Sequence, residues 1–108
     1  MNRNKETLGS DKIFVRIDPD LLDLIPGFLR NRRRDVTTLA DALNQNNFEV
    51  ICTVGHKMKG DGGGYGFEEI SRIGGELEEA AKRQERPVIV QWVNELAMYL
   101  ERVEILHD

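Results

Sequence analysis

Apolar residues recur at helical spacing in successive blocks of this sequence, and this repeat constrains its fold more than any other feature. One block covers residues 26–44, a second begins near Asn47, a third covers about 66–84, and a fourth runs from Pro87 to near Ile105. Spacings of three or four residues place the apolar side chains of each block on one face of a helix. The breaks between blocks are short, and short connections favour antiparallel neighbours. The sequence therefore predicts an all-α fold.

The start of the chain has a different pattern. Residues 1–12 are polar, and apolar residues then alternate along 13–17, which predicts a short extended segment. The Asp-Pro pair that follows is typical of a helix N-cap with proline at the first helical position, so a short helix is expected next. No block is long enough to predict a sheet. We expect a flexible or extended segment over residues 1–18 and one helical domain over residues 19–108.

Composition excludes several classes of protein. The chain has 108 residues, which corresponds to one domain. It contains no run of about 18 apolar residues, as a membrane-spanning helix needs, and its N-terminus lacks the apolar core of a secretory signal. Cys52 is the single cysteine, so no internal disulfide can form and a cytoplasmic location is the default expectation. The net charge of −4 argues against a nucleic-acid partner.

Positive charge is nevertheless concentrated in one part of the chain. Residues 26–60 contain six Lys/Arg and three acidic residues, whereas the rest of the chain is acidic. A basic region of this kind would suit an acidic protein partner. The alternative is a set of solvated helix faces, and the charge pattern leaves both interpretations open.

Two histidines are present, and their positions differ. His107 is next to the C-terminus, where a solvated side chain is expected. His56 lies in the second helical block, on the flank away from its apolar side. Lys59 lies about 60° from it around the helix, close enough to neutralise an attached anion. Gly60 and Gly63 lie on the same side and leave the imidazole uncovered.

An accessible imidazole beside an ammonium group is suited to carrying a phosphoryl group. Neutral imidazole is substantially populated at cytoplasmic pH and is nucleophilic without strong activation. A phosphoryl group on nitrogen brings nearly two negative charges, which a nearby lysine can stabilise. An exposed histidine beside a lysine is also common on ordinary helices, so this pair alone does not establish the chemistry.

The wider spacing around His56 resembles the signature of the histidine-containing phosphotransfer (HPt) family. That pattern is His-x-aliphatic-Lys-Gly, a glycine six residues beyond the first, an aliphatic residue four further on, and a later Leu-Glu pair. The matching positions are His56, Met58, Lys59, Gly60, Gly66, Ile70, Leu77 and Glu78. The resemblance covers about residues 19–105. It implies a four-helix bundle with His56 on the second bundle helix and Nε2 as the phosphorylated atom.

The resemblance also implies roles for individual side chains. Lys59 matches the lysine that contacts the phosphoryl oxygens, and Lys57 is a poorer neighbour that would act at the rim. Gly60, with Gly63 further along, would keep the approach of a partner clear. Glu78 matches the Gln or Glu that hydrogen-bonds the imidazole Nδ1 and leaves Nε2 free as the nucleophile.

Two positions depart from the family pattern. Gly55 replaces the small alanine that usually precedes the histidine, and we expect it to loosen the helix. Asp61 replaces the Ser or Ala that often follows the glycine. Its carboxylate would either repel the phosphoryl group or cap the amides around Gly62–Gly64.

The resemblance implies a phosphocarrier rather than an enzyme. The partners would be receiver domains, a sensor histidine kinase, or both, with Mg²⁺ on the receiver and no cofactor or metal on this chain. The alternative is a helical adaptor that binds signalling partners without carrying phosphate. The initial Met and a tail just past the last helix favour a stand-alone protein, and a monomer is expected.

Other chemistries fit less well. The glycine-rich stretch 60–67 has no G-x-G-x-x-G and no Gly-Lys-Ser/Thr, so it does not predict a nucleotide site. No serine or cysteine nucleophile has a paired base, which argues against a hydrolase. Cys52 is expected to be partly buried and structural rather than a thiol or metal centre. Trp92 and Tyr99 share one helical face and are expected in the core.

Overall fold

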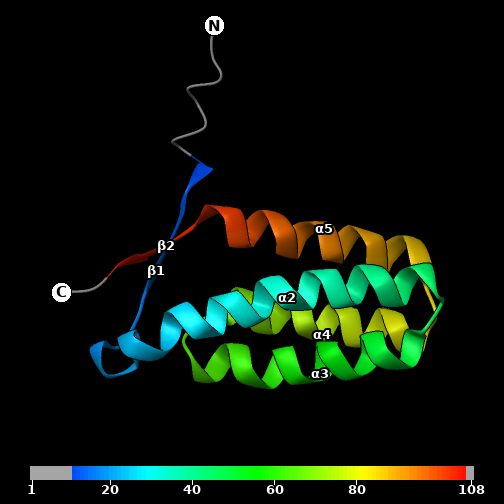
Figure 1. Ribbon diagram of the computed structural model, residues 1–108, viewed down its shortest axis with the longest axis horizontal. Coiled ribbons are helices and arrows are strands. Elements are labelled where there is room, and N and C mark those ends of the chain that lie inside the picture. The colour runs from blue at the N-terminus through cyan, green and yellow to red at the C-terminus, as the bar shows by residue number, and fades with distance from the viewer. Residues whose placement is uncertain (1–10, 107–108) are drawn as a thin grey trace, which may run out of the picture.

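The computed structural model describes residues 11–106, and this part of the chain is mostly helical (Figure 1). A short strand, β1 (Ile13–Arg16), is followed by a 3-10 helix, η2 (Pro19–Leu24). Four α-helices come next: α2 (Ile25–Asn44), α3 (Phe48–Gly64), α4 (Glu68–Lys82) and α5 (Arg86–Arg102). A second strand, β2 (Val103–Leu106), ends the described range. The predictions for residues 1–10 and for His107 lie outside the described residues.

Local sequence explains where several of these elements begin. Asp18 precedes η2, and its side-chain oxygen accepts a hydrogen bond of 2.9 Å from the Asp20 N–H. Pro26 occupies the first turn of α2, where it opens the helix and does not kink it. Asn47 caps α3 by accepting a hydrogen bond of 3.2 Å from the Val50 N–H. The N-cap predicted before η2 is therefore confirmed, and α3 begins next to Asn47, as predicted.

The glycine-rich stretch behaves differently from its prediction. Five glycines within residues 60–66 predict that the second helical block weakens or ends there, but α3 continues to Gly64. Gly62 is buried, and a Cβ on it would lie 2.6 Å from the backbone nitrogen of Ser71 on α4. Glycine costs about 1 kcal/mol per helical position. Close packing against α4 offsets that cost, and the chain turns only at Gly66, whose φ is +92°.

The C-terminal end also differs from its prediction. The last helix ends at Arg102, before the expected end near Ile105, and the next four residues form β2. β1 and β2 make a parallel two-stranded sheet, so the prediction that no block forms a sheet was wrong. The paired residues are Ile13 with Val103, Phe14 with Glu104, Val15 with Ile105 and Arg16 with Leu106. Val103 and Ile105 are half-buried between exposed residues, which is the two-residue period of a strand.

The core lies between the helices, which run side by side in Figure 1. α3 packs most extensively against α4, while α2 contacts α3 and α5. Side chains from all four α-helices are fully buried, among them Leu39, Ile51, Met58, Ile73, Leu77 and Leu96. Tyr99 is buried and Trp92 is half-buried against this core, as predicted. No helix within residues 11–106 is long and apolar enough to cross a membrane.

Candidate functional site

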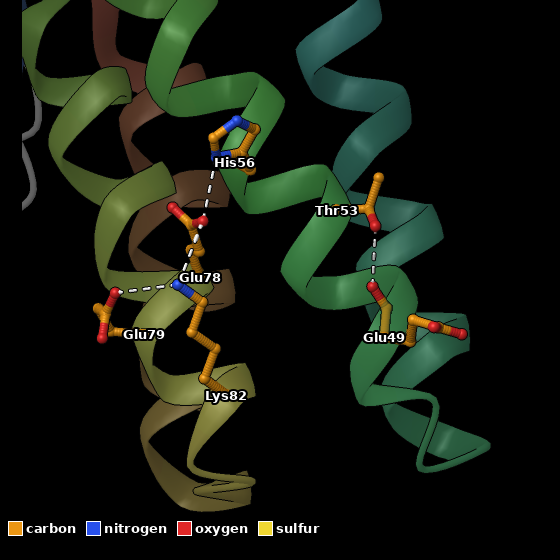
Figure 2. Close-up of polar contacts among 6 residues, drawn as sticks. All are labelled: Glu49, Thr53, His56, Glu78, Glu79 and Lys82. Atoms are coloured by element: carbon orange, nitrogen blue, oxygen red, sulfur yellow. Dashed lines mark hydrogen bonds and ion pairs between the residues drawn. The ribbon is translucent and has the colours of Figure 1, made fainter.

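His56 projects from the middle of α3, and 72% of its side chain is exposed. The adjacent core positions, Gly55 and Met58, are buried, so the imidazole stands at the edge of the α3–α4 interface. Its Nδ1 lies 3.0 Å from Oε2 of Glu78 on α4 (Figure 2). Figure 2 shows the other ring nitrogen, Nε2, on the far side of the ring from this contact. One nitrogen is therefore engaged and the other is accessible.

Glu78 is nearly buried, with 11% of its side chain exposed. Burial raises the pKa of the Glu78 carboxyl, but the hydrogen bond and charge of His56, together with Lys82 and Lys59, bring that pKa below its usual value. The carboxylate is consequently ionised at neutral pH and acts only as an acceptor. It favours the imidazole tautomer with the proton on Nδ1, which leaves the lone pair on Nε2.

Glycines bring the two helices close enough for this contact. Gly55 is buried, and a Cβ on it would lie 2.8 Å from the Glu78 nitrogen and 2.8 Å from the Gly74 oxygen. α3 is continuous through Gly55, the position at which the sequence predicted a looser helix. The absence of a Cβ instead allows α4 to pack directly against the α3 backbone.

Lys59 is exposed on α3, and its backbone and side-chain stem rest against α4. The Ser71 hydroxyl donates a hydrogen bond of 2.6 Å to the Lys59 carbonyl oxygen. The aliphatic stem passes over Gly75, where a Cβ would lie 3.6 Å from Lys59 Cδ. A Cβ at position 75 would therefore make an ordinary van der Waals contact with this stem.

Lys57 lies on the other flank of α3. It lines a small hollow of about 50 Å³ together with Arg32 and Asp35 of α2 and Val54 of α3. The structure therefore places Lys57 toward α2, while Lys59 and Glu78 lie toward α4.

Gly60 and Gly63 are exposed on α3 beyond His56. A Cβ on either glycine would meet nothing within 4 Å. The surface at these two positions is consequently open.

The Asp61 side chain contacts α2. Its Oδ2 lies 3.7 Å from Nη1 of Arg32, whose Nε lies 2.8 Å from Oδ2 of Asp35. Arg32 is buried, and its guanidinium lies over the Phe28 ring, 4.9 Å from the centroid. Within the described residues, Asp61 therefore has a cationic partner and makes no hydrogen bond to the amides of Gly62–Gly64 that we considered from the sequence.

Two contributors to the site were missed from the sequence. Lys82 lies four residues after Glu78, the spacing at which opposite charges pair on a helix, so this signal was present. Arg32 has Asp35 three residues after it on the same helix, but its contact with Asp61 had no such signal, because Asp61 belongs to another helix. Within residues 11–106, no group of three His, Cys, Asp or Glu side chains is placed to hold a metal ion.

A family model described as Hpt domain matches residues 23–105, which is most of the chain and includes the whole site. The chain belongs to the Hpt domain family. The family resemblance of the sequence is thereby confirmed. Hpt domains are phosphocarrier modules of phosphorelays and normally interact with receiver domains or kinases, so membership implies a part in histidine phosphotransfer. A search of the curated proteins and a search of the solved structures gave no match.

Proposed function

We propose that this Hpt domain accepts and donates a phosphoryl group at Nε2 of His56. The observation that carries the proposal is an exposed imidazole whose Nδ1 lies 3.0 Å from a nearly buried carboxylate, Glu78. A ring held in this way presents Nε2, with its lone pair, to a partner. The partner would be the receiver domain of a two-component system, or a sensor histidine kinase.

The transfer can be written with this chain's own groups. The lone pair of Nε2 attacks phosphorus, the N–P bond forms, and the bond from phosphorus to the receiver's aspartyl oxygen breaks, so the carboxylate leaves with the electron pair. The proton stays on Nδ1, and the positive charge of the ring lies beside the Glu78 carboxylate. Lys59 stabilises the phosphoryl oxygens, and Lys57 acts at the rim. The reverse steps return the group to a receiver.

We propose that this chain is a phosphocarrier and not an enzyme, and that it contributes little to catalysis itself. Mg²⁺ and the electrostatic stabilisation of the transferred group would come from the receiver. Gly60 and Gly63 would let the receiver approach, because their exposed surface is open.

The proposal includes the arrangement of the domain. The order of colours along the four α-helices in Figure 1 supports an antiparallel four-helix bundle, with His56 on its second helix. We further propose that the domain acts as a monomer in the cytoplasm.

The test is transfer of label from a receiver domain phosphorylated on its aspartate. We expect acid-labile, base-stable label on the wild type and none on His56→Gln. His107→Gln is the matched control, because it removes the other histidine by the same change. If no competent receiver or kinase labels the wild type, the adaptor function is supported and the carrier function is wrong.

A further inference from the structure

We propose that Lys82 is a positioning residue for phosphotransfer, which holds the Glu78 carboxylate from the side opposite His56 and weakens its pull on the Nδ1 proton. This inference rests on the proposed function of His56. Lys82 contacts neither the imidazole nor the position of the phosphoryl group, so its effect passes through Glu78.

Both side-chain partners of Glu78 meet at one oxygen. Oε2 lies 3.0 Å from His56 Nδ1 and 3.6 Å from Lys82 Nζ (Figure 2). The electron density of a single carboxylate oxygen is therefore shared between the Nδ1–H and the ammonium. A hydrogen bond to an acceptor that is already paired with a cation is weaker than one to a free carboxylate.

Neighbouring charges keep both Glu78 and Lys82 ionised. Lys82 also lies 3.6 Å from Glu79, and the charge of Glu79, followed by that of Glu78, raises the pKa of Lys82. From α3, Lys59 acts on Glu78 and the Cys52 thiol acts on Lys82. These are the chief groups that face the pair from α3 and α4.

The strength of the pull on Nδ1–H matters in both directions of transfer. In the free protein, a strong pull favours imidazolium, whose Nε2 has no lone pair and cannot attack phosphorus. In the phosphorylated protein, a proton on Nδ1 makes the ring a better leaving group, because the N–P electron pair then returns to a neutral imidazole. Water can then attack phosphorus and release inorganic phosphate. By weakening the hydrogen bond from Nδ1–H to Glu78, Lys82 keeps Nε2 of His56 nucleophilic. It also lengthens the lifetime of the phosphohistidine near neutral pH.

The first test follows the ring protons of His56 by NMR as pH is varied in the unphosphorylated domain. We expect Lys82→Met to raise the midpoint by about 0.5 pH unit, the size expected for a half-exposed ion pair. Lys82→Arg should restore the wild-type midpoint. Arg83→Met removes an exposed charge at the next position and should leave the midpoint unchanged. An unchanged or lowered midpoint in Lys82→Met overturns the proposal.

The same substitution in a Glu78→Gln background separates an effect through Glu78 from direct repulsion between Lys82 and the ring. Glu78→Gln alone should lower the midpoint, since the amide carries no charge. Adding Lys82→Met should then change nothing further. A full upward shift in this background would show that Lys82 acts directly and would overturn the proposal.

The second readout is the rate of phosphohistidine hydrolysis against pH in the labelled domain. We expect the profile of Lys82→Met to move upward by the same half unit, so that loss is about 1.5-fold faster at the wild-type midpoint and about threefold faster well above it. An unmoved profile would contradict the role in phosphotransfer. If the wild type cannot be labelled at all, the proposed function fails, while the NMR titration still decides whether Lys82 acts through Glu78.

Discussion

The backbones of Gly55 and Gly74 touch where α3 packs against α4. A Cβ on Gly74 would lie 2.7 Å from the Gly55 oxygen, and a Cβ on Gly55 would lie 2.8 Å from the Gly74 oxygen. Neither position therefore has room for a side chain. His56 follows Gly55 and Glu78 lies one helical turn after Gly74, so this close approach brings the imidazole and the carboxylate within 3.0 Å.

Gly55→Ala should destabilise the domain. The new methyl group would overlap backbone atoms of α4, and overpacking of this kind costs about 1–3 kcal/mol even after the better helix propensity of alanine is included. The free energy of unfolding in urea measures the loss. Gly63→Ala is the control: a Cβ there meets nothing within 4 Å, so stability should rise by up to about 1 kcal/mol. Equal effects of the two changes would contradict the packing argument.

Lys59→Ala should slow phosphoryl transfer about tenfold while leaving the fold intact. The ammonium group is exposed on the His56 side of α3, and a charge-assisted contact with a phosphoryl oxygen is worth about 1.5–3 kcal/mol. The transfer rate from a phosphorylated receiver measures the effect. Lys57→Ala removes the same charge on the flank toward α2 and should have a smaller effect. Unchanged kinetics in Lys59→Ala would remove this lysine from the site.

Gly60→Trp should block docking of a receiver without unfolding the domain. The position is exposed and open, so the indole would project over the surface that the partner must cover. Transfer rate and helix content, measured by circular dichroism, separate the two effects. Asn94→Trp puts the same side chain on an exposed position of α5 and should leave transfer unchanged. Normal transfer in Gly60→Trp would disprove the access argument.

Asp61→Asn should change the lifetime of the phosphohistidine by less than about twofold. The carboxylate is already paired with Arg32 at 3.7 Å, so its field at the phosphoryl group is partly neutralised. Stability should fall by no more than about 1 kcal/mol, since the Asp61 side chain is half-exposed. The rate at which the label is lost measures this lifetime. A lifetime severalfold longer in Asp61→Asn than in the wild type would show that Asp61 repels the phosphoryl group.

Some features of this domain follow from short-range rules. The positions of α2, α3, α4 and α5 follow from apolar spacing, to within a few residues at each end. His56, Lys59 and Gly60 lie on one helix, so helical rotation alone places them on a common surface.

Other features depend on contacts between distant parts of the chain. Val103 and Ile105 fit both a helical and an alternating pattern, and pairing with β1 decides in favour of the strand. Gly62 and Gly55 look like helix breakers locally, yet packing against α4 makes them necessary.

His56 shows both kinds of determination at one residue. The sequence by itself determined that this imidazole lies on an exposed helix flank beside a lysine and a glycine, because those relations depend only on helical geometry. The tertiary structure alone decided that Glu78 lies 3.0 Å from Nδ1 and shares Oε2 with Lys82. That contact depends on how closely two helices approach, and the approach is determined by a glycine on each of them, Gly55 and Gly74, which lie far apart in the chain.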